Sequence, residues 1–493
     1  TRRSSDLGAP VAAVAFVQHL LGAVWALLML WTGRRAGGSA AGLAAGIVAA
    51  LYAPAVFHEG EMLSDSLTLF LSSAMLLAWL SARQRGGVAR HAASGTLAGL
   101  AVITRPTVLL PALATAAGAA WRAVRGGGNP GPRRRAIVAL AAFLLPLVVL
   151  VALPSIRNAA QGDFNLVASQ GGINFWLGNN PGANGVSVIV PPVRQSGAAA
   201  YRDSVQVFGV GAYLAATGAA SAAAPADSVV SRYWYGRALQ WMRAHPGDAA
   251  SLTARKFVAA LNNHEVRNNR GFGFARAHAS LVLRLLPVTF GLVAALAVAG
   301  LVALPRLPLR RRAACGWLLL SAATTLAGVL AFFVAGRLRL PLAGHLIPLA
   351  GVGVAALWHA AARRDLRASA APALAAALAA AFSFWSWPVL DYRLSPAQPA
   401  GLGLRATEHP GMDFALLAQG ALDNGRAADA MALAVRAARE APALPYAHSL
   451  VGEAAMAAAE PRTAARAFLT AADLRPDDPA AFVNLGAAME ALG

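Results

Sequence analysis

The sequence has almost no cysteine and almost no lysine. Its 493 residues include a single cysteine, Cys315, which excludes a disulfide framework and a cysteine zinc site. Lys256 is the only lysine, so the formal net charge of +20 comes almost entirely from arginine. Charged residues make up only 13% of the chain and hydrophobic residues 57%. The arginines fall in short clusters between apolar runs and do not spread over one face.

The apolar residues form runs of roughly the length that crosses a bilayer, about 18 to 24 residues each. We predict ten membrane segments in an all-α, polytopic helical bundle, with two short segments at residues 93–104 and 107–121. The other eight segments are residues 10–31, 39–57, 63–81, 136–153, 281–304, 313–334, 341–360 and 368–390.

The arginine clusters predict the orientation of the bundle, because they fall in every second connection. The positive-inside rule therefore puts all of them in the cytoplasm. This topology signal accounts for most of the basic charge, so nucleic-acid binding is not predicted. The clusters are Arg34/Arg35, Arg83/Arg85/Arg90, Arg122/Arg125/Arg133/Arg134/Arg135, Arg306/Arg310/Arg311/Arg312 and Arg363/Arg364/Arg367.

The same alternation places residues 58–65, Arg105, the large loop of residues 154–280 and residues 336–341 on the opposite, outer side. Everything after residue 390 and the N-terminus also lie there, so we expect any chemistry on this side. The chain begins "TRRSSDLGAP", without Met or a signal-like segment. We therefore expect that at least one upstream span is missing.

The large outer loop is too long to be a simple connector, so it should have structure of its own. From Asp227 its apolar residues recur at helical spacing, His245-Pro246-Gly247 breaks the pattern, and residues 252–261 resume it. This pattern predicts two amphipathic helices near the membrane surface.

The segment from about Met412 repeats itself at a shift of 34 residues. Small residues at helix crossings and Pro at turns with this period are typical of tetratricopeptide repeats. The chain stops at "AAMEALG", inside the first helix of a third repeat, so its C-terminus also looks cut. The aligned positions are Leu417 with Val451 and Leu485, Ala430 with Ala464, Ala438 with Ala472, Pro442 with Pro476, Pro445 with Pro479, and Gly452 with Gly486.

Three acids and a histidine lie together in "HEGEMLSD", residues 58–65, at the membrane boundary. Acids this close to hydrocarbon are costly unless they serve a site or find partners. Glu61 and Asp65 are four residues apart and would share a helix face, which favours a site. The alternative is a short, solvated polar loop. Oxygen ligands with one imidazole could also hold a divalent cation, although no recognised ligand spacing is present.

Arg105 in "VITRPTVLL", together with Arg337 and Arg339 in "FFVAGRLRLPLAGH", lies on the outer side, where topology does not favour positive charge. A guanidinium holds phosphate oxygens in a fork, so these arginines suit anion recognition. The alternative is that they snorkel to lipid headgroups.

The stretch "SQGGINFWLGNNPGANG" crowds Gly and Asn around a short aromatic run. Turn chemistry at Asn179-Asn180-Pro181-Gly182 could explain the crowding, with residues 173–177 as a short strand.

These motifs together resemble the polytopic GT-C glycosyltransferases, and are most similar to the family 39 type, which includes the aminoarabinose transferases and protein mannosyltransferases. The resemblance covers roughly residues 10–390. It rests on "YAPAVFHEGEMLSDSLTLFL", "GTLAGLAVITRPTVLL", "PSIRNAAQGDFNLVASQGGINFWLGNN", "ARKFVAALNNHEV" and "AFFVAGRLRLPLAGHLIPLAG", in this order.

The resemblance implies an inverting transfer of a sugar from a polyprenyl-phosphate carrier to a lipid, glycan or protein acceptor on the outer face. Glu61 and Asp65 match an acidic stretch with a catalytic role, whereas the remaining matched positions would bind substrate or phosphate. Leu338 replaces the usual Tyr of the late arginine motif. The binding positions are Arg105, Arg337, Arg339, Gln170, Asn174, Asn179, Asn180 and Glu265.

The family's principal catalytic Asp lies in the first outer loop, and this chain begins only at the end of that loop. We therefore expect the given chain to lack its main catalytic acid. No cofactor is certain and the metal is unknown, with a divalent cation left open. The expected location is a bacterial inner membrane, with the large loop and the repeats in the periplasm and membrane lipids as partners.

The predicted organisation has five parts. Residues 1–153 and 281–390 form the two membrane parts, residues 154–280 the loop domain, residues 391–411 a linker, and residues 412–493 the repeats. Two readings from other classes stay open: a transporter of lipid-linked substrates, and a non-catalytic membrane scaffold whose repeats recruit a protein partner.

Overall fold

The computed structural model describes residues 8–125, 130–186, 209–218, 225–268, 270–387, 410–476 and 478–493. The regular elements of these residues are helices, with no named strand among them, as the predicted all-α class requires. The predicted linker, residues 391–411, lies outside the described residues except for its last two.

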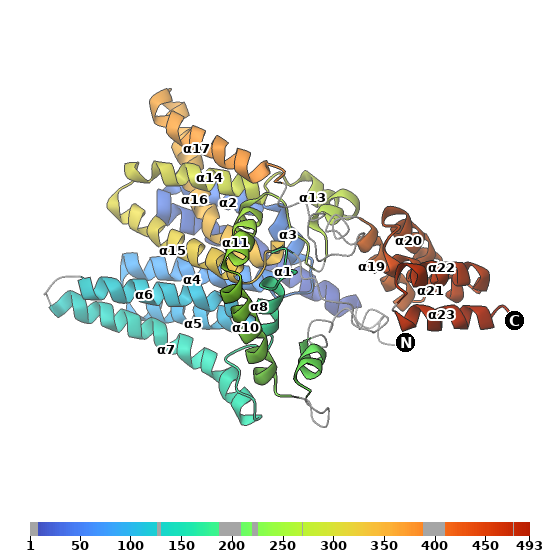
Figure 1. Cartoon of the computed structure of the whole chain (residues 1–493). Coiled ribbons are helices and arrows are strands. Elements are labelled where there is room, and N and C mark those ends of the chain that lie inside the picture. Colours follow the sequence, from blue (N-terminus) through green and yellow to red (C-terminus); the bar gives the residue numbers. More distant parts are fainter. Residues whose placement is uncertain are drawn as a thin grey trace.

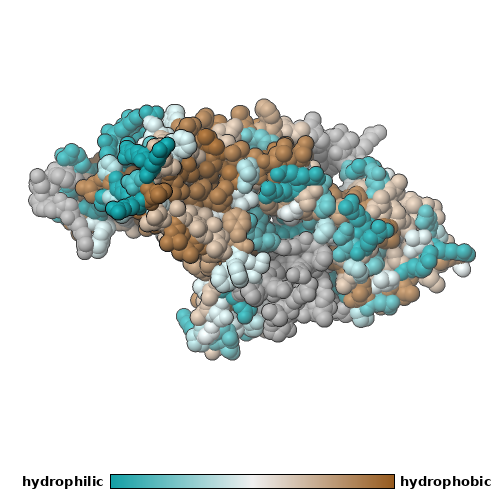
Figure 2. All heavy atoms as spheres, turned by 90° about the horizontal axis from the view of Figure 1, so that it is seen from above, coloured by the Kyte–Doolittle hydropathy of each residue, from teal (hydrophilic) through white to brown (hydrophobic). Residues whose placement is uncertain are grey.

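Seven helices of the described part are long and apolar enough to cross a membrane. Figure 1 shows most of them side by side, and Figure 2 shows an apolar band over this bundle with hydrophilic residues gathered at its end away from the repeats. These helices indicate an integral membrane protein. They are α1 (Gly8–Gly37), α4 (Asp65–Arg85), α6 (Leu109–Arg125), α7 (Pro130–Ala160), α15 (Leu309–Ala331), α16 (Gly336–Ala362) and α17 (Leu366–Phe384).

The prediction of ten spans is corrected at the other three places, where the helices are shorter. The second predicted segment divides into α2 (Ser39–Ala50) and α3 (Ala53–Glu59), and the seventh into α13 (Leu281–Leu285) and α14 (Phe290–Ala303). Pro287 follows the extended Leu286, because proline disfavours a helical conformation of the residue before it. Pro54 lies in the first turn of α3, where a helix tolerates proline. The remaining short helix is α5 (Val88–Thr104).

The two interruptions lie beside each other. Tyr52 and Val288 form an isolated parallel bridge, in which the Ala53 amide donates to the Val288 carbonyl at 3.0 Å. Inside a membrane bundle an unpaired backbone group is costly. This hydrogen bond pairs a backbone amide at the first break with a backbone carbonyl at the second.

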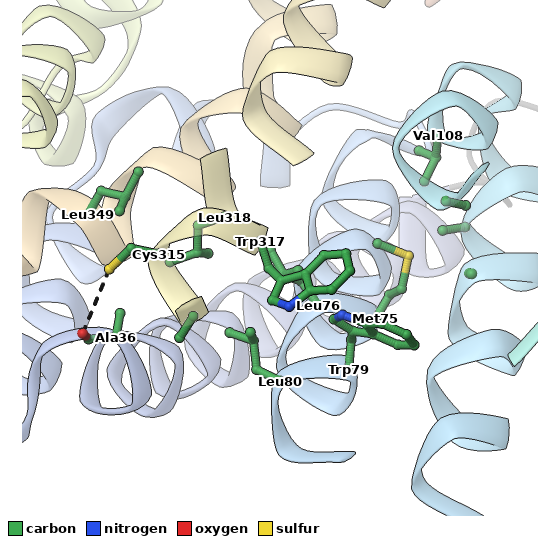
Figure 3. Close-up of a cluster of buried hydrophobic side chains, with 14 of the residues drawn as sticks. Ala36, Met75, Leu76, Trp79, Leu80, Val108, Cys315, Trp317, Leu318 and Leu349 are labelled. Carbon is green, nitrogen blue, oxygen red and sulfur yellow. Dashed lines mark hydrogen bonds between the residues drawn. The ribbon is translucent and has the colours of Figure 1, made fainter. Parts of the chain in front are cut away.

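The core of the bundle is built around two tryptophans. Trp79 of α4 packs edge to face against Trp317 of α15, with ring centroids 5.2 Å apart, and also against Phe143 of α7. Figure 3 shows Cys315 beside this cluster, with its Sγ directed at the Ala36 carbonyl 3.7 Å away. The cysteine is buried, so it is a packing residue of α15.

Three of the predicted cytoplasmic arginine clusters meet at one end of the bundle. Arg35 donates to the Gln84 side chain and Arg310 to the Gln84 carbonyl, each at 2.8 Å. Arg311 donates to the Gly37 carbonyl at 3.1 Å. The predicted alternation of the connections therefore agrees with the packing, and we call this end the arginine end.

At the opposite end, α8 (Gly171–Gly178), α10 (Asp227–Ala244) and α11 (Pro246–Leu261) run across the ends of the membrane helices (Figure 1). The two helices predicted from residue 227 onward are confirmed as α10 and α11, with the break at His245. The predicted strand at residues 173–177 is wrong, because α8 covers it. A short apolar run has no period that separates strand from helix, and packing against α10 decides between them.

The repeats form helix pairs at the end of the molecule beyond α8, α10 and α11 (Figure 1). The second helices of two successive pairs begin at Ala427 and Pro461, 34 residues apart, as the sequence period predicts. Small residues such as Ala434 and Ala447 are fully buried where these helices cross. The five helices are α19 (Pro410–Asp423), α20 (Ala427–Glu440), α21 (Pro445–Ala457), α22 (Pro461–Leu474) and α23 (Pro479–Glu490).

Candidate functional site

A small pocket that is partly open to solvent lies at the end of the bundle opposite the arginine end. The α3–α4 connection, the loop after α11 and the start of α16 form its walls. We call it the Arg337 pocket. Its lining residues are Phe57, His58, Glu61, Leu63, Glu265, Val266, Asn268, Arg270, Phe272, Gly336 and Arg337.

Asp65 lies behind the pocket wall and joins two of the predicted arginines. Its side chain is fully buried, and Oδ1 accepts a short hydrogen bond from Arg105 Nη2. Arg337 Nε lies 3.3 Å from the other oxygen, Oδ2. Arg105 also donates to the Arg337 carbonyl at 3.0 Å. Three residues that are far apart in the sequence therefore form one buried cluster, in which Asp65 orients both guanidinium groups.

His58 faces the same carboxylate from the pocket side. Its Nδ1 is 4.0 Å from Asp65 Oδ2, and neither atom has a hydrogen-bond partner among the described residues. Burial lowers the pKa of His58 to about 4, and the attraction of Asp65 only partly opposes this. The imidazole is therefore neutral near pH 7 and leaves the cluster's charge unchanged.

The other two acids of "HEGEMLSD" take different partners. Glu61 lies 3.7 Å from Arg270 Nε, whereas Glu59 Oε2 lies 2.8 Å from His19 Nδ1. Burial raises the pKa of Glu61, and Arg270 opposes this shift. The alternative of a solvated loop does not fit these buried contacts. The three acids point to three separate neighbours, and the described residues contain no group of three metal-ligating side chains.

The charges around the pocket do not balance. Asp65 compensates only one of Arg105 and Arg337, whereas Glu61 is paired with Arg270 and Glu265 with Arg339. With a neutral His58, these four arginines and three carboxylates leave one positive charge over. Arg337 is 21% exposed, so an anion that enters the pocket can reach this charge.

Arg339 is placed differently from Arg337, although the two are only two residues apart. Its side chain is 1% exposed, and its Nη2 lies 2.7 Å from Glu265 Oε1. The guanidinium donates to carbonyls at the end of α11, including those of Ala260 and His264, and lies over the Phe290 ring. Arg339 therefore closes a helix C-terminus and is not a pocket residue. Burial raises the pKa of its partner Glu265.

The predicted ligands Gln170, Asn174, Asn179 and Asn180 do not line the pocket. Asn174 donates to the Gln170 carbonyl at 2.9 Å, and Asn180 donates to the Trp176 carbonyl at 2.9 Å. Asn179 is buried, donates to Ala331 O and accepts from Lys256 Nζ, both at 2.8 Å. These contacts favour a structural role for Asn174, Asn179 and Asn180.

The glycines of the same stretch permit close approach of two backbones. A Cβ atom on Gly172 would lie 1.8 Å from the Ser231 carbonyl oxygen of α10. One on Gly178 would lie 2.0 Å from the Phe332 carbonyl oxygen, just after α15. The two glycines therefore allow α8 to pack closely between α10 and the end of α15.

Sequence reasoning missed Asn268, Arg270 and Phe272 as pocket residues. Arg270 belongs to the loop that the sequence predicts on the outer side, but so do Arg267 and Arg276, so its charge alone does not single it out. Asn268 accepts from Arg337 Nη1 at 3.1 Å, and Phe272 packs against Phe57 with centroids 5.7 Å apart. Neither has a sequence signal, because only the fold of the loop brings it to the pocket.

No protein-family model matches the chain, and a comparison with curated proteins finds no match.

Proposed function

We propose that this chain is the membrane part of a GT-C type glycosyltransferase of the family 39 kind, which moves a sugar from a polyprenyl-phosphate carrier to a lipid, glycan or protein acceptor. The observation that carries the proposal is the surplus positive charge of the Arg337 pocket. A lipid phosphate at Arg337 would neutralise it, and the pocket's place at the end of the apolar bundle allows the lipid tail to stay in the membrane.

Within this proposal Glu61 and Asp65 have different roles. Glu61 lines the pocket, and burial raises its pKa, so it is a stronger base than an exposed glutamate and suits activation of an acceptor hydroxyl. Asp65 is fully buried behind Arg337 and therefore acts as a positioning residue for the phosphate-binding guanidinium. Arg105 completes the same cluster.

Binding of a polyprenyl phosphate to the full chain in lipid nanodiscs tests the proposal. We expect the phosphate to bind at least about tenfold more tightly than the uncharged polyprenol, because a charge-assisted contact is lost with the alcohol. Arg337→Gln should remove this preference. Arg243→Gln, at an exposed arginine of α10, is the matched control and should keep it.

Equal affinities for the phosphate and the alcohol would refute the proposal, as would an unchanged preference in Arg337→Gln. Glu61→Gln should keep phosphate binding, because the role proposed for Glu61 concerns the acceptor hydroxyl and not the phosphate.

The proposal includes a bacterial inner membrane as the location, with the arginine end in the cytoplasm and the pocket and repeats in the periplasm. The meeting of Arg35, Arg310 and Arg311 at one end supports this orientation. The 34-residue helix pairs support tetratricopeptide repeats, which would bind a protein partner or acceptor.

A second candidate, a transporter of lipid-linked substrates, is favoured by the two interrupted segments that meet at Tyr52 and Val288. Paired broken helices in the two halves of a membrane bundle are typical of transporter sites. Liposomes that contain the chain and a fluorescent lipid-phosphate probe distinguish the two. Movement of the probe across the bilayer without any sugar transfer would favour the transporter.

A further inference from the structure

The first helix of the repeats contacts the loop that lines the Arg337 pocket. Asp413 of α19 accepts from Arg267 Nη1 at 2.8 Å, and both side chains are nearly buried, at 6% and 4% exposure. The other oxygen of Asp413 accepts from the Gly271 backbone amide at 3.2 Å. One carboxylate therefore holds the loop at two points, before and after Arg270.

An aromatic contact continues this interface. Phe414, next to Asp413, packs edge to face against Phe274 with centroids 5.0 Å apart, and also lies near His278. Phe274 packs with the buried cluster of the repeats. A buried ion pair beside an apolar contact excludes water, which makes this a defined interface.

The loop residues between Arg267 and Phe274, which both contact α19, include residues that line the pocket. Arg270 approaches Glu61, and Phe272 packs against Phe57, on the opposite wall. Asn268, on the other side of Arg270, accepts from Arg337. Asp413 touches none of these pocket groups itself, but it holds the chain segment that carries them.

Asp413 departs from the pattern of its own repeat. At the 34-residue shift its equivalents are Ala447 and Ala481, both buried among neighbouring repeat helices. A small apolar residue thus suits the position in the repeat fold. A carboxylate at this position places a buried charge in the repeat, which is unfavourable. Burial raises the pKa of Asp413, and Arg267 opposes this shift. The contact with the loop explains the exception.

We propose that Asp413 is a positioning residue for the Arg337 pocket, and that the repeat segment forms the outer support of the loop that carries Arg270 and Phe272. The inference does not depend on the chemistry of the pocket. It makes the repeats a structural part of the site in addition to any partner-binding role.

Hydrogen–deuterium exchange of the full chain in nanodiscs tests this inference. In Asp413→Ala, which installs the residue of the other two repeats, we expect roughly tenfold faster exchange at Gly271 to Phe274, because a charge-assisted hydrogen bond is lost. Exchange should also rise at residues 57–63 across the pocket, whereas α20 to α22 should stay protected. Asp429→Ala, which removes an exposed ion pair with Arg426 in the same segment, should change neither region.

A substitution of Arg267, the loop partner of Asp413, should affect exchange in the same regions. Arg267→Ala should also speed exchange, but less than Asp413→Ala, because the Gly271 amide keeps its acceptor. The double variant should exchange no faster than Asp413→Ala alone, since Asp413→Ala already removes the ion pair with Arg267. Unchanged exchange at residues 57–63 would overturn the inference. So would loss of protection in α20 to α22, since Asp413 would then serve the fold of the repeats alone.

Discussion

Lys256, the only lysine of the chain, donates its Nζ to the Oδ1 of Asn179 at 2.8 Å. The same ammonium donates to the Leu330 carbonyl at 3.2 Å, so it joins α11, the end of α8 and the end of α15. Burial lowers the pKa of Lys256 to about 8. A buried amine with a side-chain partner is a structural connection, which moves Asn179 from the predicted substrate ligands to the supports of the fold.

Asn179→Ala should destabilise the protein by about 2 kcal/mol, because it leaves a buried ammonium with one fewer acceptor. Asn174→Ala removes a hydrogen bond that is exposed, and should change stability by less than about 0.5 kcal/mol. Thermal unfolding of both variants in nanodiscs measures the difference. Equal stabilities would mean that the contact between Lys256 and Asn179 contributes nothing.

Gly178→Ala should be strongly destabilising, because the added Cβ meets the Phe332 carbonyl and forces α8 away from the end of α15. We expect a loss of about 2 to 3 kcal/mol, the usual cost of overpacking. Gly236→Ala is the matched control, since a Cβ there meets nothing within 4 Å in the middle of α10. This control should be neutral or slightly stabilising, because Ala favours a helix. Similar unfolding temperatures for the two variants would contradict the close approach.

Arg339→Lys should unfold the end of α11 despite keeping the charge. A single ammonium cannot reach both Glu265 and the carbonyl groups that the guanidinium bridges. We expect a loss of about 3 kcal/mol, as for other broken buried pairs. Arg255→Lys, at an exposed arginine of the same helix α11, should leave the unfolding temperature unchanged. If Arg339→Lys also leaves the unfolding temperature unchanged, Arg339 does not stabilise the end of α11, and the predicted role in substrate binding is favoured instead.

His58 should make stability depend on pH below neutrality. Its pKa falls from an ordinary 6.5 to about 4 in the folded protein, so the unfolded chain binds a proton in this range and the folded chain does not. The stability that neutral His58 contributes is complete above about pH 6.5 and declines as the pH falls toward 4. The difference in unfolding temperature between the wild type and His58→Gln should therefore shrink or reverse over this window. A constant difference would show that His58 titrates normally.

The sequence could predict the helical class, the alternation of the arginine clusters and the 34-residue period, because each follows from local spacing along the chain. Arg105, Arg337 and the acids of "HEGEMLSD" could also be predicted as candidates, because charge next to hydrocarbon is costly wherever it occurs. Sequence alone could not count the long helices, because Pro287 lies at a helix break whereas Pro146 and Pro348 lie inside unbroken helices.

The tertiary structure alone decided how these charges pair. Arg337 and Arg339 have the same chemistry and nearly the same position in the sequence, yet Arg337 lines the pocket and Arg339 closes a helix end. Asp65 meets Arg105 and Arg337 only because α4, α5 and α16 converge at one end of the bundle. Residue types and periods set the local structure, whereas the partners of a charge depend on contacts between distant segments, which packing determines.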